Sequence, residues 1–222
     1  KACDAQVGDD FHINPEEIES KYYGVLTKMF NVARFASQFR VPDDLETAPN
    51  GLITEDLWIL SEFNQVMSRV SNAWSELDIY NAAQTIKGFW TGVFPGHWLE
   101  MSKSRLYDGD KSAEWTLHRM VRDLLTAFSP ICPFFTHYLS TEIYLTSAVD
   151  IRDFPSLVQI EIPDKNGEMT DLTPMIMEFN SLVWKAKKDG GLSLKSPISG
   201  IAVPEDISIL SEALTRMHRL EF

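Results

Sequence analysis

Apolar side chains recur every three or four positions over most of residues 14–145. This spacing places them on one face of an α-helix, whereas a half-buried strand would alternate at every second position. Short stretches containing Pro, Gly or Asp divide the pattern into five segments. Amphipathic helices joined by short connections pack as antiparallel neighbours. The sequence therefore predicts a mainly α fold built on a five-helix bundle, in a domain of residues 1–155.

Capping residues predict the ends of the first two helices. Asn14 is a suitable N-cap for a helix whose first position is Pro15, and we expect this helix to end near Phe39. A loop should follow, and a second helix should begin after Thr54. The apolar face predicted for the second helix consists of Leu60, Phe63, Met67, Val70, Trp74 and Leu77.

Helix breakers lie inside the third segment, which begins after the potential cap Asp78. Gly88, Gly92 and Pro95 interrupt its helical pattern, and a proline removes one backbone hydrogen bond and clashes with the preceding turn. We therefore expect a kink in this helix. The elements expected next are a turn at residues 105–111 and helices at 113–128 and 133–143.

The pattern changes near Pro155. Val158, Ile160 and Ile162 alternate with other residues, as in a strand, and residues 164–167 have the composition of a turn. The remaining elements expected are helices at 172–188 and 205–219 and a short strand at 201–203. Together they predict a small α/β C-terminal unit over residues 156–222.

The charge of the chain is strongly acidic, with 20 Lys and Arg against 32 Asp and Glu and a formal net charge of −12. Nucleic-acid-binding proteins usually have a basic balance, so the charge alone favours a helical module that binds protein. Phosphate contacts need only a local basic face, however, and RNA binding stays open. No apolar run approaches the roughly 20 residues that cross a bilayer, so no membrane partner is expected.

Cysteine and histidine positions predict neither a disulfide framework nor a metal site. Cys3 and Cys132 have no metal-binding spacing and are expected to be free thiols in a reducing compartment. The five histidines lack the HxxxH and HExxH spacings of helical metal sites. A helical di-metal enzyme would need Glu-x-x-His pairs on two helices, and the sequence has no such pairs.

Four segments of the predicted bundle carry motifs that occur together in one enzyme family. They are Asn31-Val32-Ala33-Arg34-Phe35, Asp56-Leu57-Trp58-Ile59-Leu60-Ser61, Trp98-Leu99-Glu100 with Lys103, Arg105, Leu106 and Tyr107, and Pro130-Ile131-Cys132-Pro133-Phe134-Phe135-Thr136. In this order they resemble the anticodon-binding region of class I aminoacyl-tRNA synthetases. The resemblance is greatest to the valyl type, with the isoleucyl and leucyl types as alternatives.

This resemblance implies a tRNA partner, bound through its anticodon stem-loop, and contact with the parent enzyme's own catalytic domain. The catalytic and editing domains are expected upstream, together with the sites for ATP and Mg²⁺. We therefore expect no cofactor and no catalytic residue in this chain, and a cytoplasmic location. Residues 100–104 and Gly96-His97 imitate synthetase signature motifs, but both are expected to lie inside a bundle helix.

Three groups of residues are candidates for contact with RNA. Asn31, Arg34, Phe35 and Gln38 share one face of the first helix, and the resemblance points to the same helix. An arginine beside an aromatic ring suits an unstacked base, although Phe35 packed in the core is the alternative. The candidates for phosphate contact are Lys103 and Arg105 at a helix end and Lys187, Lys188 and Lys195 around a Gly-Gly turn.

A further row of polar and aromatic residues lies in the fourth helix. Arg119 and Arg122 share a face with Trp115 and His118. We expect this row to form a charged outer face of the helix, with a second RNA-facing surface as the alternative.

Overall fold

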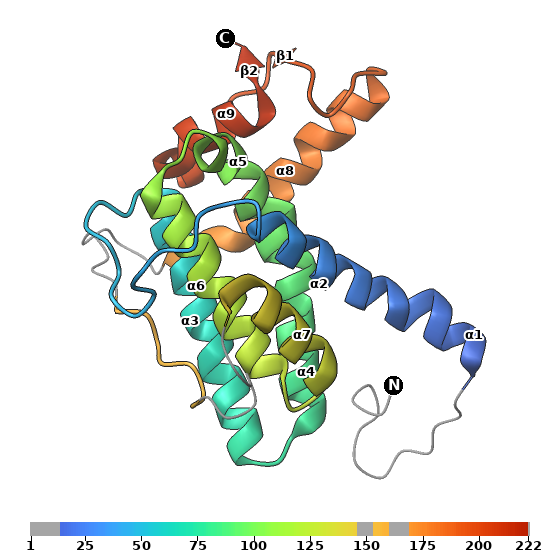
Figure 1. Cartoon of the computed structure of the whole chain (residues 1–222). Coiled ribbons are helices and arrows are strands. Elements are labelled where there is room, and N and C mark those ends of the chain that lie inside the picture. The colour runs from blue at the N-terminus through green and yellow to red at the C-terminus, as the bar shows by residue number, and fades with distance from the viewer. Residues whose placement is uncertain (1–13, 146–152, 160–168, 222) are drawn as a thin grey trace.

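The computed structural model describes residues 14–145, 153–159 and 169–221, and it is mainly α (Figure 1). The predicted bundle and the smaller C-terminal unit are both present. The bundle helices are α1 (Pro15–Glu17), α2 (Tyr23–Ala36), α3 (Thr54–Ser75), α4 (Ile79–Gly88), α5 (Leu99–Tyr107), α6 (Lys111–Phe128) and α7 (Pro133–Tyr144). The C-terminal unit contains α8 (Leu172–Asp189), β1 (Ile198–Ser199), α9 (Ser211–His218) and β2 (Leu220–Glu221).

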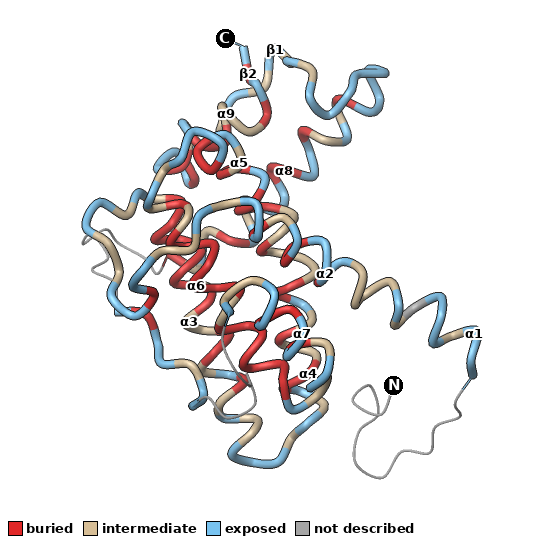
Figure 2. The backbone as a smooth tube through the Cα atoms, viewed as in Figure 1, coloured by how far each residue is buried: buried red, intermediate tan, exposed pale blue. Residues whose placement is uncertain are grey.

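The first helix begins as predicted, because the Asn14 Oδ1 accepts a hydrogen bond from the Glu16 amide at 2.9 Å. A π-helical turn, Ile18–Tyr22, joins α1 to α2, so the helix runs without a break to Ala36. Its N-terminal half extends away from the rest of the molecule and is largely exposed, whereas its C-terminal half lies against the bundle (Figures 1 and 2). The buried residues of α2 are Met29, Val32, Ala33 and Ala36.

The apolar face predicted for α3 is mostly confirmed, but the assignment of its last residue, Leu77, to this face is wrong. Leu60, Phe63, Met67 and Val70 are fully buried. Leu77 is instead 79% exposed and has a φ of 58°, because it lies in the tight turn between α3 and α4. The next helix starts where predicted, with the Asp78 carboxylate accepting a hydrogen bond from the Asn81 amide at 3.0 Å.

The kink expected at Pro95 is replaced by a change of helical geometry. Residues Phe89–Trp98 form a π-helix that continues from α4 directly into α5. A π-helix is wider than an α-helix, which relieves the clash of a proline ring with the preceding turn. Arg105 belongs to α5, so the turn predicted from residue 105 begins only at Asp108.

One hydrophobic core joins the bundle to the C-terminal unit. It includes the fully buried Trp58, Trp90 and Trp98 of the bundle together with Ile176 and Leu214 from α8 and α9. Hydrogen bonding follows the same route, since Trp58 Nε1 donates to Thr173 Oγ1 at 2.8 Å. The two units are therefore packed around one common core.

Both strand predictions for the C-terminal unit need correction. Val158 belongs to no strand, because its backbone N–H and C=O bond to the Asn64 side chain at 2.8 and 2.9 Å. Ile160, Ile162 and the turn predicted at 164–167 lie outside the described residues. The segment 201–203 is also not a strand. The strand lies at Ile198–Ser199 instead, and it pairs in parallel with Leu220–Glu221.

The helix predictions for this unit are confirmed. α8 ends at Asp189, before Gly190 and Gly191, and residues 205–218 form a 3₁₀ segment, Glu205–Leu210, followed by α9. In the described part of the chain, no helix combines the length and apolar character that crossing a membrane requires.

Candidate nucleic-acid interface

The polar face predicted for the first helix is open to solvent. Asn31 and Arg34, on the C-terminal half of α2, and Gln38, in the turn that follows this helix, are all exposed. The Arg34 guanidinium lies 5.9 Å from the centroid of the Phe30 ring, and the Gln38 amide donates to the Arg34 carbonyl at 3.4 Å. No acidic side chain pairs with Arg34 among the residues that the structure describes. Its charge is therefore available to an anionic ligand.

Phe35 occupies the border between this face and the core. It is half-buried and packs at the edge of the bundle core. Its ring centroid lies 4.9 Å from that of Phe39 and 6.2 Å from that of Tyr107, and the Phe39 and Tyr107 centroids are 5.5 Å apart. We call these three residues the aromatic cluster. It joins the C-terminal end of α2 to that of α5, and Tyr107 is its most exposed member at 66%.

The sequence did not single out two members of the aromatic cluster. The sequence pattern indicates only a helix end near Phe39, and it includes Tyr107 only as the last residue of a motif. The signal that points to them is an aromatic residue at the C-terminal end of each of two helices. Their proximity depends on how α2 and α5 pack, which no local pattern reveals.

Lys103 lies one helical turn before Tyr107 on α5 and is partly exposed. Its ammonium forms an ion pair with Glu100 at the helix surface. Surface pairs of this kind contribute little to stability and exchange readily with other partners. A phosphate contact by Lys103 stays a prediction.

The predicted phosphate contact by Arg105 is wrong, because its side chain is buried and fully engaged. The guanidinium bonds to both carboxylate oxygens of Asp56 at 3.0 and 2.8 Å, to Glu55 at 2.8 Å and to Asp110 at 2.9 Å. Burial alone would lower the pKa of Arg105, but these three carboxylates raise it above its usual value. Arg105 therefore holds the start of α3 against α5 and α6.

Lys187 is likewise unavailable to RNA, which corrects its assignment to the basic cluster. Its side chain is fully buried, and its ammonium donates to the backbone carbonyls of Leu194 and His218 at 2.9 and 2.7 Å. Burial, and then the nearby charge of Arg219, lower the pKa of Lys187. Lys188 and Lys195 are exposed, and they remain predicted contacts with the tRNA backbone.

A buried histidine pair lies next to Lys187. The Asn180 amide joins them, with Nδ2 at 2.8 Å from His97 Nδ1 and Oδ1 at 2.6 Å from His218 Nε2. This geometry suits neutral imidazoles, with Asn180 donating to His97 and accepting from His218. Burial lowers the pKa of both histidines, that of His218 to about 4. His97 thus has a structural partner in Asn180. Residues 96–104 lie within the continuous helix formed by Phe89–Trp98 and α5, as predicted.

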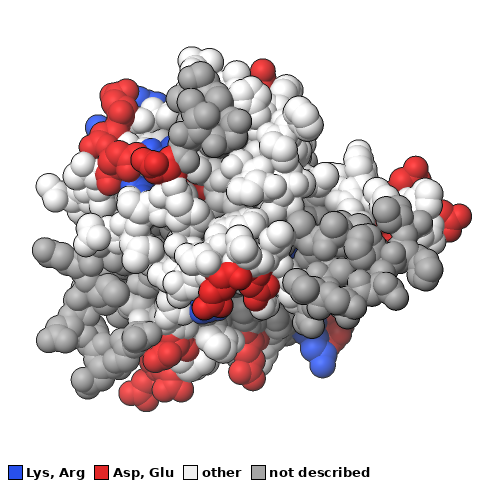
Figure 3. Space-filling model, turned by 90° about the horizontal axis from the view of Figure 1, so that it is seen from below, with Lys and Arg blue, Asp and Glu red and all other residues white. Residues whose placement is uncertain are grey.

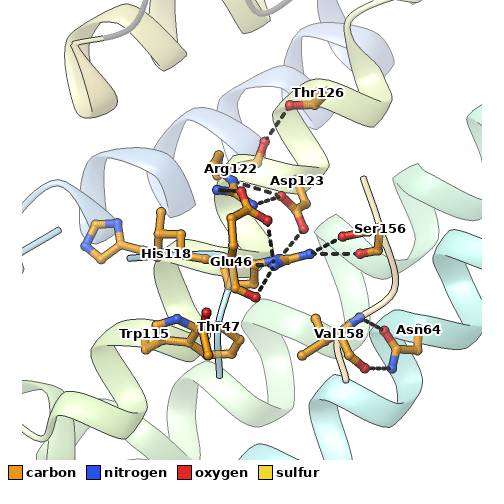
Figure 4. A network of polar contacts seen from close by, with 12 residues as sticks. Glu46, Thr47, Asn64, Trp115, His118, Arg122, Asp123, Thr126, Ser156 and Val158 are labelled. Carbon is orange, nitrogen blue, oxygen red and sulfur yellow. Dashed lines mark hydrogen bonds and ion pairs between the residues drawn. The ribbon is translucent and has the colours of Figure 1, made fainter. Parts of the chain in front are cut away.

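In the row predicted as a charged outer face of α6, Trp115, His118 and Arg119 are buried and Arg122 is partly buried. Arg119 is 1% exposed and donates to Asp123 at 2.6 Å, to the Leu45 carbonyl at 2.8 Å and to the Ser156 carbonyl at 2.8 Å (Figure 4). Burial raises the pKa of Asp123, against the effect of Arg122 and Arg119. Arg119 therefore fastens two irregular segments of the chain to α6, and neither prediction for this row holds.

The surface beside Arg119 is unsuited to phosphate. A pocket of about 790 Å³ lies between the 41–46 segment, α6 and the 153–156 segment, and its charged lining residues are Arg122 and the carboxylates Asp43, Asp44, Glu46, Asp123 and Asp153. The end of the molecule shown in Figure 3 also carries several clusters of Asp and Glu and few Lys or Arg. Within the described ranges, no three His, Cys, Asp or Glu side chains are grouped to hold a metal ion. The open face of α2 therefore remains as the candidate interface.

Comparisons with known proteins identify relatives that cover most of this chain. Among curated relatives, valine--tRNA ligase of Saccharolobus solfataricus is 29% identical over 197 residues, which cover 88% of this chain and 23% of the relative. Valine--tRNA ligase of Aeropyrum pernix is 28% identical over 98% of this chain and 27% of the relative. That of Methanosarcina acetivorans is 30% identical over 80% of this chain and 21% of the relative. The chain thus spans about a quarter of the length of these relatives.

The family model that matches the chain is described as the anticodon-binding domain of tRNA ligase, and it covers residues 56–202. This range runs from the first turn of α3 through α8 and β1. The chain therefore belongs to the family of anticodon-binding domains of tRNA ligases.

Proposed function

We propose that this chain is the anticodon-binding part of a valine--tRNA ligase and that the exposed face of α2 reads the anticodon loop. Family membership and the names of the relatives support this proposal. The parent enzyme would join valine to its tRNA with ATP and Mg²⁺ in a catalytic domain outside this chain. Its place of action would be the cytoplasm, because the family serves translation.

The observation that carries the proposal is the exposed row of Asn31, Arg34 and Gln38 directly beside Phe35. Single-stranded RNA is recognised by rings that stack on splayed bases and by polar groups that bond to base edges. A guanidinium serves either a base edge or a phosphate. The face of α2 thus presents, within two helical turns, each group that recognition of an unstacked anticodon base requires.

Phosphate contacts would set the register of the anticodon stem-loop on this face. Lys103 on α5 and the exposed Lys188 and Lys195 of the C-terminal unit are the proposed contacts. Such local contacts are compatible with the acidic net charge, because five carboxylates of the chain line a separate pocket between the 41–46 segment, α6 and the 153–156 segment.

The test is fluorescence anisotropy of the chain with valine tRNA, isoleucine tRNA, leucine tRNA and an unrelated tRNA, each at low and moderate salt. We expect the tightest binding to valine tRNA, weakening steeply with salt as phosphate contacts are screened. Preference for isoleucine or leucine tRNA would reassign the amino acid. Absence of binding to all four would favour a module that binds protein.

A matched pair of arginine variants localises the interaction. Arg34→Ala should weaken binding to valine tRNA by about 1–3 kcal/mol if its guanidinium reads a base. Arg69→Ala is the control, because Arg69 is exposed on α3 and bonds to Gln65 of the same helix. Equal affinities of the two variants would remove α2 from the interface.

A further inference from the structure

Tyr107 has an unusual combination of exposure and aromatic contacts. It is 66% exposed, yet its ring meets those of Phe35 and Phe39 at interplanar angles of 87° and 60°. Edge-to-face contacts of this kind orient a ring while leaving much of its surface open. Tyr107 is therefore held in place without being covered.

The two phenylalanines have the opposite character. Phe35 and Phe39 are half-buried, pack against the bundle core and contact each other at 4.9 Å. Much of their surface is occupied by protein. They form a base on which Tyr107 rests, so the ring that the aromatic cluster presents to solvent is chiefly that of Tyr107.

Exposed charged and polar groups lie near the ends of the two helices that meet at this ring. Lys103 precedes Tyr107 by one turn on the same face of α5, and its ammonium is partly exposed. Arg34 precedes Phe35 on α2, Gln38 lies in the turn after this helix, and both are exposed. An aromatic surface between a lysine and an arginine is the arrangement that takes a base on the ring and the adjoining phosphates on the cations.

We propose that Tyr107 is a base-stacking residue of this interface, on which one unstacked base of the anticodon loop rests, and that Phe35 and Phe39 position its ring. This inference rests on the proposed function, because it takes the anticodon stem-loop as the ligand. It extends the proposed binding surface from the face of α2 to the junction of α2 with α5.

The test uses a set of valine tRNA anticodon stem-loops, each with 2-aminopurine at a different anticodon position. Stacking on an aromatic ring quenches the fluorescence of 2-aminopurine and contributes to affinity. Tyr107→Leu keeps an apolar contact with Phe35 and Phe39 but removes the ring, and it should weaken binding about tenfold. Tyr107→Phe keeps the ring and should bind within about twofold of the unaltered protein.

The control is Tyr138→Leu on α7, because Tyr138 is 56% exposed and belongs to no aromatic pair that the structure describes. We expect the control to retain both affinity and quenching, and Tyr107→Leu to lose quenching at one anticodon position. Equal affinity and quenching in Tyr107→Leu and the unaltered protein would overturn the inference while leaving the proposed function intact. Failure of the unaltered protein to bind the stem-loop would overturn both.

Discussion

The guanidinium of Arg216 donates to both carboxylate oxygens of Glu55, at 2.8 and 2.7 Å, although 161 positions separate the two residues. Glu55 also accepts from Arg105, which binds Asp56 and Asp110. Burial raises the pKa of Glu55, and the two arginines oppose that rise. The last helix of the chain is therefore bonded, through one buried carboxylate, to the first turn of α3.

Arg216→Ala should lower the free energy of unfolding by about 2 kcal/mol, because buried Glu55 loses two charge-assisted hydrogen bonds but keeps Arg105. Urea denaturation measures the change. Arg69→Ala, which removes an exposed arginine with a partner on its own helix, should stay within about 0.5 kcal/mol of the unaltered protein. A similar loss in both variants would show that the contact between Arg216 and Glu55 contributes little.

Local signals predicted the helices, because caps and prolines act on their immediate neighbours. The Asn14 side chain accepts from the amide two residues later and that of Asp78 from the amide three residues later, so both caps can be predicted from the sequence. The strand predictions rested on alternation alone, without a local capping contact. Val158 satisfies its backbone groups with the Asn64 side chain, 94 positions away, and alternation of apolar residues cannot reveal that partner.

The same reasoning explains the failures at the site. The sequence predicts that Arg105, Arg119 and Lys187 lie at the surface, since charged residues are almost never fully buried unless paired. Arg105 and Arg119 each have one local partner, Asp110 and Asp123, but burial also depends on distant ones, since Asp56, Leu45 and His218 lie 49, 74 and 31 positions from Arg105, Arg119 and Lys187. The exposed face of α2 was predictable, because helical period alone separates it from the buried residues.

The stability of the protein should fall as the pH drops from about 6.5 towards 4. Burial lowers the pKa of His97, and it lowers those of His118 and His218 to about 4, below the ordinary 6.5. Below pH 6.5 these histidines bind protons in the unfolded chain but stay neutral in the folded chain, so protonation favours unfolding. The contribution is fully present above pH 6.5 and is lost as the pH falls to about 4.

A comparison of variants isolates this effect from the carboxylates. The free energy of unfolding of His218→Gln, followed by urea denaturation from pH 7.5 to 4.5, should depend less on pH than that of the unaltered protein. His137→Gln, which changes an exposed histidine, should leave the slope unchanged. Parallel curves for all three proteins would place the acid sensitivity elsewhere.

Phe35→Ala should weaken binding to valine tRNA by about 1–3 kcal/mol, whether its ring stacks on a base or positions Tyr107. Because Phe35 is half-buried, this variant should also lose stability, and Phe35→Leu separates the two effects by keeping most of the packing. Anisotropy and thermal unfolding are measured on both. A loss of stability without any loss of tRNA affinity would assign Phe35 to the core alone.

Two adjacent lysines provide a stringent test of the phosphate contacts. Lys188 is exposed, whereas Lys187 is fully buried and bonded to two backbone carbonyls. Lys188→Ala should leave stability unchanged and reduce the dependence of log K on log salt by about 1, because one phosphate contact is lost. Lys187→Ala leaves two carbonyl oxygens without a donor and should cost about 1–3 kcal/mol of stability. At a temperature where both variants remain folded, Lys187→Ala should keep the salt dependence of the unaltered protein. An unchanged salt dependence in Lys188→Ala would instead show that the end of α8 lies away from the bound RNA.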